Sequence, residues 1–481
     1  MMRRTKIVAT LGPATSTADS IEALIKAGVN VVRLNFSHGT AEEHIARADL
    51  VREMARKVGR IVGILGDLQG PKLRISRFIE GKVFLESGAP FILDAALASD
   101  AGTVERVGLG YKQLVNDVHA GDELWLDDGR IVLLVNAVEG AEIHTTVING
   151  GYLSNNKGLN RRGGGLSADA LTDKDREDIK TAAAMDVDFL AVSFHRSADD
   201  ILEARRLLEA AGGKAAIVAK MERAETMESP ILEEIIKASD VIMIARGDLG
   251  VEIGDAKLPR AQKRLIKKAR NLNRVVITAT QMMETMIDNP IPTRAEVFDV
   301  ANAVIDGTDA VMLSGETATG KHPARVVATM AAICAEAEQS IDTRHIEHRS
   351  DQHFHRVDEA IAMATIYTAN HMHVRAIAAL TESGATPLWM SRLRSGIPIY
   401  AITRTRKAAH LVSLFRGVYP VIAHHPVTDP KVANRQAVDR LLEDKVVDEG
   451  DLVIVTKGDL MGIKGGTNQM KILRVGEHQN G

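Results

Sequence analysis

The sequence predicts an α/β fold built on a closed (β/α)8 TIM barrel, with a small β domain inserted into it and an α/β domain after it. Three observations lead to this prediction. Eight short apolar runs alternate with amphipathic helical segments, more than a hundred residues separate the third run from the fourth, and a polar linker precedes a second α/β pattern.

The eight runs are rich in Val, Ile and Ala, as the strands of a parallel sheet covered on both faces must be. They are Lys6–Leu11, Val31–Ser37, Ile61–Leu68, Asp188–Phe194, Ala215–Met221, Asp240–Gly247, Arg274–Thr280 and Ala310–Gly315. The helical segments between them have clear ends, such as the capping residue Ser20 and the terminal Gly28. An open doubly wound sheet is the alternative, but the GxGxxG turn expected after an early strand is absent. Eight units therefore predict a closed barrel.

The insertion, about Gln69 to Gly165, lacks a helical pattern. Its apolar segments are separated by Gly and Asp turns and include Lys82–Leu85, Glu123–Leu126, Ile131–Leu134 and Ile143–Ile148. This pattern predicts a small all-β domain, which we expect to be a β barrel placed on an active-site loop as a lid.

A second α/β pattern follows a His-rich polar segment, which we interpret as a solvated linker rather than a metal site. Its expected strands lie near Val374–Leu380, Ile397–Ile402, Val418–Ala423, Asp451–Thr456 and Met470–Val475. The predicted domains are therefore 1–68 with 166–341 (barrel), 69–165 (lid), 342–355 (linker) and 356–481 (C-terminal α/β domain).

Composition excludes several classes of protein. The 481 residues carry a net charge of −3, which gives no electrostatic reason to expect a nucleic-acid partner or an anionic membrane. The single cysteine, Cys334, lies in an apolar helical stretch and is expected in the core. With no disulfide possible, no signal-peptide pattern and no run of about 18–20 apolar residues, we expect a cytoplasmic protein.

Polar residues stand at the carboxyl ends of six of the eight strands, the end that carries the active site in barrels of this kind. They are Arg33, Asn35 and Ser37; Asp67; Lys220 and Glu222; Arg246 and Asp248; Thr280; and Ser314 and Glu316.

Lys220 and Glu222 are two apart on a strand, so both side chains face the same side. Glu222 and Asp248 on neighbouring strands suit Mg²⁺ or Mn²⁺, which take oxygen ligands and leave positions open for substrate. Lys220 and Arg33 would gather the charge of a phosphoryl group in transfer. Salt bridges internal to the barrel are the structural alternative.

Two further segments are candidate phosphate sites. Gly315–His322 is close to a P-loop, but His322 replaces the required Ser or Thr, and we reject it. The segment Thr381–Thr386 lies between a strand and a helix, and its hydroxyls and N–H groups favour either an anion site or a simple capped turn.

Six motifs, in register over nearly the whole chain, closely resemble the pyruvate kinase family. They are VVRLNFSHG (31–39), GDLQGPKLR (66–74), AKMERAE (219–225), MIARGDLGVE (243–252), ATQMMETM (279–286) and MLSGETATGKHP (312–323). The resemblance implies phosphoryl transfer from phosphoenolpyruvate to ADP, a Mg²⁺ or Mn²⁺ cofactor, an allosteric C-terminal domain and a homotetramer.

The resemblance also implies residue roles. Glu222 and Asp248 match the metal ligands, Lys220 the residue that stabilises the phosphoryl group, and Arg33 a contact to it. Gly247, Asp248 and Thr280 match the substrate-carboxylate site, with Thr280 or a nearby water as the candidate proton donor. The positions that match nucleotide-side contacts are Asn35, His38, Arg74 and Lys157. Those that match the phosphate loop for a phosphorylated effector, either a sugar phosphate or AMP, are Thr381, Ser383 and Thr386.

One position departs from the family pattern. Potassium-dependent members usually carry Glu where this chain has Lys72. A lysine ammonium carries the charge of K⁺ and can take its place, so we predict activity without potassium. The cation region comprises Asn35, Ser37, Asp67, Leu68 and Lys72.

Two other functions stay open from the sequence. One is another Mg²⁺ barrel enzyme acting on pyruvate or phosphoenolpyruvate, such as a lyase or aldolase. The other is a catalytically silent metabolite sensor, although Lys220 and Glu222 are both present.

Overall fold

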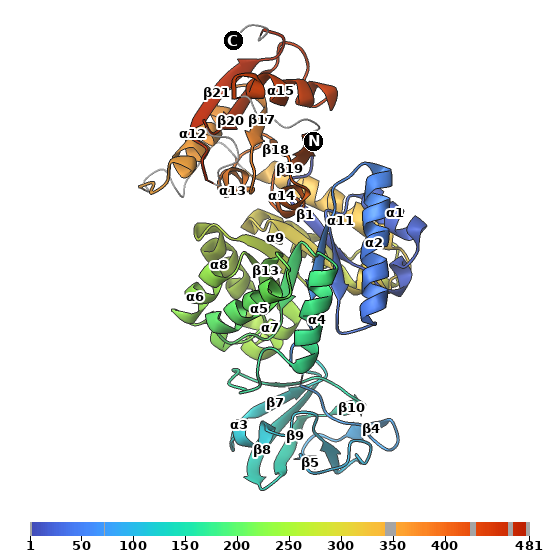
Figure 1. Cartoon of the computed structure of the whole chain (residues 1–481). Coiled ribbons are helices and arrows are strands. Elements are labelled where there is room, and N and C mark those ends of the chain that lie inside the picture. The colour runs from blue at the N-terminus through green and yellow to red at the C-terminus, as the bar shows by residue number, and fades with distance from the viewer. Residues whose placement is uncertain (1, 72, 342–352, 424–429, 460–464, 478–481) are drawn as a thin grey trace.

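The computed structural model describes residues 2–71, 73–341, 353–423, 430–459 and 465–477. Its three parts form a row, with the β-rich insertion and the C-terminal domain at opposite ends of the barrel (Figure 1). None of the described helices is both long and apolar enough to cross a membrane.

Eight parallel strands close into a barrel in the order β1-β16-β15-β14-β13-β12-β3-β2, which confirms the predicted fold class. Each predicted run contains one strand, which is shorter than the run by one to three residues. The strands are β1 (Lys6–Thr10), β2 (Val31–Asn35), β3 (Gly63–Asp67), β12 (Phe189–Val192), β13 (Ala216–Met221), β14 (Val241–Ala245), β15 (Val275–Ala279) and β16 (Ala310–Leu313).

Helices cover the outside of the barrel. They are α1 (Ala18–Ala27), α2 (Ala41–Val58), α4 (Asp173–Ala184), α5 (Ala198–Ala210), α6 (Ile231–Ala238), α8 (Leu258–Asn271), α9 (Arg294–Asp306) and α11 (Pro323–Ala337). Two short helices, α7 (Arg246–Ile253) and α10 (Gly315–Ala318), follow β14 and β16 at the carboxyl-terminal rim. Helix α1 begins one turn earlier than Ser20, because Thr17 accepts the Ser20 N–H as its N-cap.

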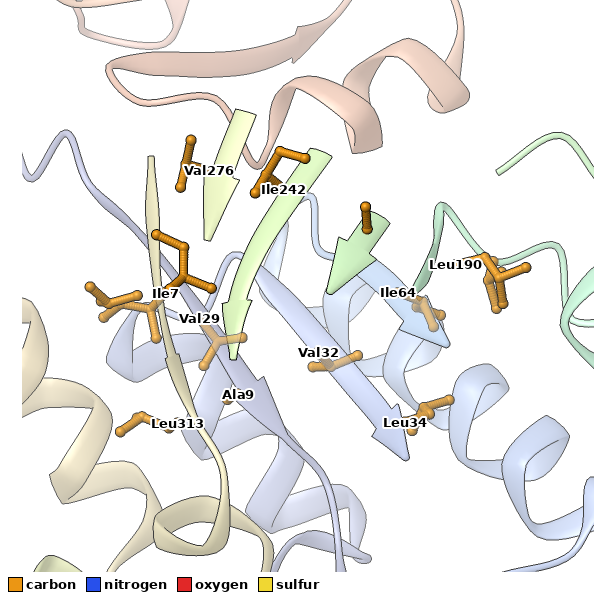
Figure 2. Close-up of a cluster of buried hydrophobic side chains, with 14 of the residues drawn as sticks. Ile7, Ala9, Val29, Val32, Leu34, Ile64, Leu190, Ile242, Val276 and Leu313 are labelled. Carbon is orange, nitrogen blue, oxygen red and sulfur yellow. The ribbon is translucent and has the colours of Figure 1, made fainter. Parts of the chain in front are cut away.

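Strand alternation divides the barrel between two hydrophobic clusters. Ile7 and Ala9 pack with the surrounding helices in one cluster, part of which Figure 2 shows. Val8, between them in sequence, belongs to a second cluster that fills the barrel and continues into the C-terminal domain.

The insertion is all-β except for the short helix α3 (Leu114–Asp117) and has a hydrophobic cluster of its own. The expected small β barrel is a six-stranded sheet, β11-β7-β8-β9-β5-β6, beside a two-stranded ladder of β10 and β4, without a closed ring among its described residues. These strands are β4 (Lys82–Leu85), β5 (Pro90–Asp94), β6 (Arg106–Gly108), β7 (Glu123–Leu126), β8 (Ile131–Glu139), β9 (Glu142–Asn149), β10 (Gly151–Ser154) and β11 (Leu159–Arg161).

The C-terminal domain holds a five-stranded sheet in the order β19-β18-β17-β20-β21, parallel except for its last strand. Its strands are β17 (Val374–Leu380), β18 (Ile399–Thr403), β19 (Val418–Ile422), β20 (Leu452–Lys457) and β21 (Gln469–Arg474). Its helices are α12 (Val357–His371), α13 (Ala385–Ser391), α14 (Arg406–Val412) and α15 (Pro430–Glu443). Cys334 is buried in α11, as predicted, and 342–352 of the predicted linker lie outside the described residues.

Candidate active site

The polar strand ends of one half of the barrel meet at its carboxyl-terminal rim. Strands β2, β3, β12, β13 and β14 are neighbours in the closed sheet, so their ends lie side by side. The structure thereby brings together Arg33, Asp67, Lys220 and Glu222, which are far apart in sequence.

These four side chains form one charged network. Arg33 Nε donates to Asp67 Oδ2 at 2.6 Å, and Arg33 Nη1 donates to Thr10 Oγ1 at 3.1 Å. Lys220 Nζ lies 3.3 Å from Asp67 Oδ1 and 2.9 Å from Glu222 Oε1. Asp67, which we predicted in the cation region, therefore joins the two cations predicted to hold a phosphoryl group.

Burial and charge act on this network in opposite directions. Burial alone would lower the pKa of Lys220, but the carboxylates of Asp67 and Glu222 raise it above the ordinary value. Burial would likewise raise the pKa of Asp67, but Lys220 and Arg33 hold it below its ordinary value. Lys220 is thus a fixed positive charge at neutral pH.

The pKa of Glu222 is shifted in the opposite direction to that of Asp67. Burial, together with the nearby negative charge of Asp248, raises the pKa of Glu222 to about 7 despite the ammonium of Lys220. Its Oε2 accepts the Phe194 N–H at 2.7 Å, while its buried Oε1 makes only the ion pair to Lys220 and receives no hydrogen bond from the described residues. Glu222 thus presents a buried carboxylate oxygen without a hydrogen bond from the described residues, close enough to Asp248 to feel its charge.

This arrangement of two carboxylates fits a divalent cation. A carboxylate oxygen that is buried, lacks a hydrogen bond and lies near a second carboxylate is the donor arrangement that Mg²⁺ or Mn²⁺ uses. Among the residues that the structure describes, no group of three or more His, Cys, Asp or Glu side chains could hold a metal. Two protein carboxylates therefore leave the remaining positions to water or substrate oxygens.

Thr280 and Gly247 lie together at the ends of β15 and β14. Gly247 N–H donates to Thr280 Oγ1 at 2.9 Å, and the same hydroxyl donates to the Ala279 carbonyl at 2.7 Å. Thr280 has φ +65°, a left-handed conformation that is costly for a β-branched residue. The predicted substrate-carboxylate residues are thus adjacent, with the Gly247 N–H covered by the Thr280 hydroxyl.

The sequence analysis did not predict Ser193, at the end of β12, as a residue of this site. Lys220 Nζ donates to Ser193 Oγ at 2.6 Å, and this hydroxyl donates to the Leu68 carbonyl at 2.8 Å. The strand-end rule that found the other site residues could have found Ser193, because it follows the last strand residue, Val192.

Two polar strand ends do not face the site. Arg246 binds Asp299 in two contacts of 2.7 and 2.8 Å and donates to the Thr280 and Gln281 carbonyls. Glu316 accepts the Ser314 N–H at 2.7 Å and the Met283 N–H at 3.1 Å. Both side chains hold the rim loops in place.

The predicted nucleotide residues divide between the barrel and the lid. Asn35 ends β2, and His38 follows in an exposed turn whose carbonyl accepts from His44 Nε2 at 2.8 Å. Arg74 and Lys157 lie in the lid, where Arg74 donates to the Asn156 carbonyl and Lys157 Nζ pairs with Asp127 at 2.7 Å.

The lid joins the rim through close backbone contacts. Gly70 N–H donates to Asp175 Oδ1 at 3.0 Å, and at φ +67° a Cβ on Gly70 would lie 2.9 Å from the Ser193 Cβ. On the other chain segment, Arg223 donates to the Leu166 carbonyl at 2.7 Å and Gly163 N–H donates to the Glu252 carbonyl.

The predicted cation region is partly described. Asn35 and Asp67 are opposite each other on β2 and β3, and the Asn35 side chain accepts the Ser37 N–H at 3.1 Å. Leu68 is buried and its carbonyl accepts from Ser193. Lys72 lies outside the described residues.

The predicted phosphate loop precedes α13. Thr381 Oγ1 accepts the Gly384 N–H at 2.9 Å, which is the geometry of a capped turn. Thr386 is buried, and its hydroxyl lies 2.6 Å from that of Thr467. The turn 465–468 therefore lies beside this loop.

The chain matches two family models. Residues 2–327 match "Pyruvate kinase, barrel domain", and residues 359–473 match "Pyruvate kinase, alpha/beta domain". It is 56% identical over 476 residues to the pyruvate kinase II of Salmonella typhimurium, covering 98% of this chain and 99% of that protein. It is 55% identical to a pyruvate kinase of Haemophilus influenzae, over 95% and 96% of the two chains. A pyruvate kinase of Geobacillus stearothermophilus is 43% identical, over 98% of this chain and 80% of that protein.

Proposed function

Because this chain belongs to the pyruvate kinase family and transfers the phosphoryl group of phosphoenolpyruvate to ADP, we propose how its residues divide that work. Lys220 and Arg33 gather the negative charge of the phosphoryl group as it leaves the enol oxygen for the ADP oxygen. Asp67 holds both cations, since it contacts each of them. Phosphoryl transfer asks mainly for positioning and charge stabilisation, and a preformed cationic pair supplies both.

Glu222 and Asp248 hold the divalent cation. Pyruvate kinases generally use Mg²⁺ in this role. When bound, this ion neutralises charge on the substrate oxygens. The buried Oε1 of Glu222, which receives no hydrogen bond from the described residues, and the nearby charge of Asp248 support the assignment.

The substrate carboxylate binds at Gly247, Asp248 and Thr280. In this proposal it displaces the Thr280 hydroxyl from the Gly247 N–H, which frees that hydroxyl to face the substrate. The enolate left by the transfer takes a proton at C3 to give pyruvate, and Thr280 or a water near it delivers the proton.

ADP lies between the rim and the lid, with Asn35 and His38 on the barrel and Arg74 and Lys157 on the lid. This assignment rests on the domain division proposed for the chain, 1–68 with 166–341, 69–165, 342–355 and 356–481. Lys157 must leave Asp127 to reach a nucleotide, so Asp127→Asn should lower the KM for ADP and leave the KM for phosphoenolpyruvate unchanged.

The observation that carries the proposal is the contact of Lys220 with both Asp67 and Glu222. The test is a coupled assay of ADP-dependent pyruvate formation with Lys220→Met and, as a control, the exposed helical variant Lys180→Met. We expect kcat to fall by about 10²–10³ for Lys220→Met alone, as for loss of one preorganised charge-stabilising group. Equal activity of the two variants would remove Lys220 from the reaction.

We further propose that the enzyme does not need potassium, because Lys72 stands at the position of the potassium-site Glu. The wild type and Lys72→Glu are assayed in buffers with and without K⁺. The wild type should be active in both and the variant only with K⁺, whereas an inactive wild type without K⁺ would refute the idea.

The C-terminal domain is proposed to bind a phosphorylated effector at Thr381, Ser383 and Thr386, either a sugar phosphate or AMP. The support is a turn that a second loop approaches through Thr467. Thermal shifts with both ligand classes, repeated on Ser383→Ala, test it. A melting temperature that no phosphorylated metabolite changes would mean that the loop binds none.

A homotetramer is also proposed. Ile291, just before α9, and Phe298, within it, are 64% and 75% exposed, and a second subunit packed there would remove these apolar side chains from water. Light scattering should give a tetramer mass for the wild type and a smaller mass for Phe298→Glu. A monomeric wild type would refute the proposal.

A further inference from the structure

A cavity of about 320 Å³ lies between the barrel and the C-terminal domain, away from the carboxyl-terminal rim. Helix α8, the end of α9 and the chain just after it form one wall. The segment from Met390 to Ser395 and the residues Arg416 and Gly417 form the other. Both domains therefore contribute to one cavity.

The lining is strongly cationic. The barrel side supplies Arg4, Lys263, Lys267 and Arg270, and the C-terminal side supplies Arg392, Arg394 and Arg416. Asp306 is the sole acidic side chain among the described lining residues.

Nearby carboxylates balance only part of this charge. Lys263 pairs with Asp306, Arg392 with Asp309, and Arg4 with Glu338. Lys267 and Arg394 form no ion pair with any residue that the structure describes.

Two buried guanidinium groups bind backbone oxygens here. Arg270 donates to the carbonyls of Gly307 and Arg392, both at 2.8 Å. Arg416 donates to the carbonyls of Val304 and Thr308 at 2.8 and 3.2 Å. The carbonyl oxygens accept hydrogen bonds from these guanidinium groups but carry no formal negative charge.

The crowding of positive charge has an electrostatic effect. Burial, followed by the charge of Arg392, lowers the pKa of Arg270 to about 9. Asp309 acts to raise this pKa, and Arg416 and Arg394 act to lower it. Burial also lowers the pKa of Arg416. An anion in the cavity would relieve this repulsion.

We propose that the cavity binds a small organic anion with two or more negative charges and an apolar body. Lys267 and Arg394 would contact the charged groups, since they have no competing carboxylate. The apolar side chains of Ile305, Leu393 and Ile397 line the same space and would contact the body. The volume is within the usual range for small-molecule sites, about 300–1,000 Å³.

This site differs from the proposed effector loop. That loop stands at the start of α13, whereas the cavity is lined by Met390 and Ser391 at its end. Because residues of both domains would hold the ligand, binding should stabilise the joined arrangement of the two domains.

The test uses phenyl phosphate, a dianion with an apolar ring, and inorganic phosphate as the probe without one. Titration calorimetry is done on the full chain without Mg²⁺. The wild type is compared with Lys267→Glu/Arg394→Glu and with Arg264→Glu, an exposed change of the same sign on α8 outside the cavity. Thr381→Val reports binding at the effector loop.

We expect phenyl phosphate to bind the wild type more tightly than inorganic phosphate. Binding should weaken about tenfold or more in the double variant, since each charged hydrogen bond contributes at least that much. Arg264→Glu and Thr381→Val should leave it unchanged, and pyruvate formation should continue in Arg264→Glu and in the double variant.

Three results would overturn the proposal: no binding to the wild type, undiminished binding to the double variant, or loss of binding in Thr381→Val alone. Thermal unfolding without ligand gives a second check. Lys267→Glu should melt at a higher temperature than Arg264→Glu, because it adds a carboxylate to a cationic cavity, and a lower temperature would count against the charge excess.

Discussion

The two rims of the barrel are covered in different ways. At the carboxyl-terminal rim the lid has a hydrophobic cluster of its own and contacts the barrel through hydrogen bonds such as that from Gly70 N–H to Asp175 Oδ1. At the amino-terminal rim the C-terminal domain shares one cluster with the barrel interior. There Arg392 reaches across the boundary to Asp309, and both side chains are 0% exposed.

Because of this difference, the two domains are held on the barrel to different degrees. A lid with its own core can move without opening the hydrophobic clusters of the barrel. The C-terminal domain cannot leave without opening the shared cluster. The cationic cavity lies at this shared boundary, so a signal from the proposed effector loop would have to cross it.

The largest expected effect comes from removing an ion pair between the barrel and the C-terminal domain. Arg392→Met leaves the buried Asp309 carboxylate without its guanidinium, which should cost about 3–5 kcal/mol of unfolding free energy. Denaturant unfolding measures it. Arg404→Met is the control, because its pair with Glu382 is partly exposed and should contribute at most about 1 kcal/mol. Equal losses would mean that the buried pair does not hold the domains together.

A matched pair of leucines tests the two cores next. Leu133 and Leu414 are both 0% exposed, one in the lid cluster and one in the shared cluster. Each change to Ala should cost about 2–5 kcal/mol, but within different units. Hydrogen exchange should rise only in the lid for Leu133→Ala, and in both the barrel and the C-terminal domain for Leu414→Ala. Faster exchange in barrel strands of Leu133→Ala would contradict separate cores.

A smaller effect depends on pH. Burial would raise the pKa of Glu338, but hydrogen bonds from Arg4 and Thr5 hold it below its ordinary value of 4.5. The unfolded chain therefore takes up this proton first as pH falls, so the stabilisation is present above pH 4.5 and is lost below it.

Glu338→Gln should thus cost about 1.5–3 kcal/mol at pH 7 and progressively less below pH 4.5. Urea midpoints at several pH values measure this, with the exposed Glu336→Gln as control. A loss that stays constant with pH would mean that the charge of Glu338 is not what the hydrogen bonds stabilise.

The smallest expected effect concerns Ser193 at the carboxyl-terminal rim. Ser193→Ala removes the acceptor at 2.6 Å from Lys220 Nζ, and kcat should fall about tenfold with the fold intact. Thr319→Ala, whose hydroxyl binds the Gly315 carbonyl in an exposed turn, should leave kcat unchanged. Steady-state kinetics with circular dichroism distinguishes this positioning role from a loss of folded protein.

The strands and helices could be predicted from the sequence because their signals are local. Apolar runs, caps and glycine stops depend on neighbours in the chain, and the spacing of Lys220 and Glu222 alone placed both on one face. Helix α3 and the arrangement of the lid strands were not predicted, because sheet order depends on contacts between distant segments.

By itself the sequence determined the barrel, its polar rim and the residues that match the family motifs. Only the tertiary structure decided which polar residues serve the site. It turned Arg246 and Glu316 toward rim loops, brought Asp67 between Arg33 and Lys220, and placed Ser193 against the lysine. It also put Arg392 opposite Asp309, 83 residues away. The physical reason is that charge pairing acts through space, so the partner of a charge is fixed by the closed sheet and the docked domain.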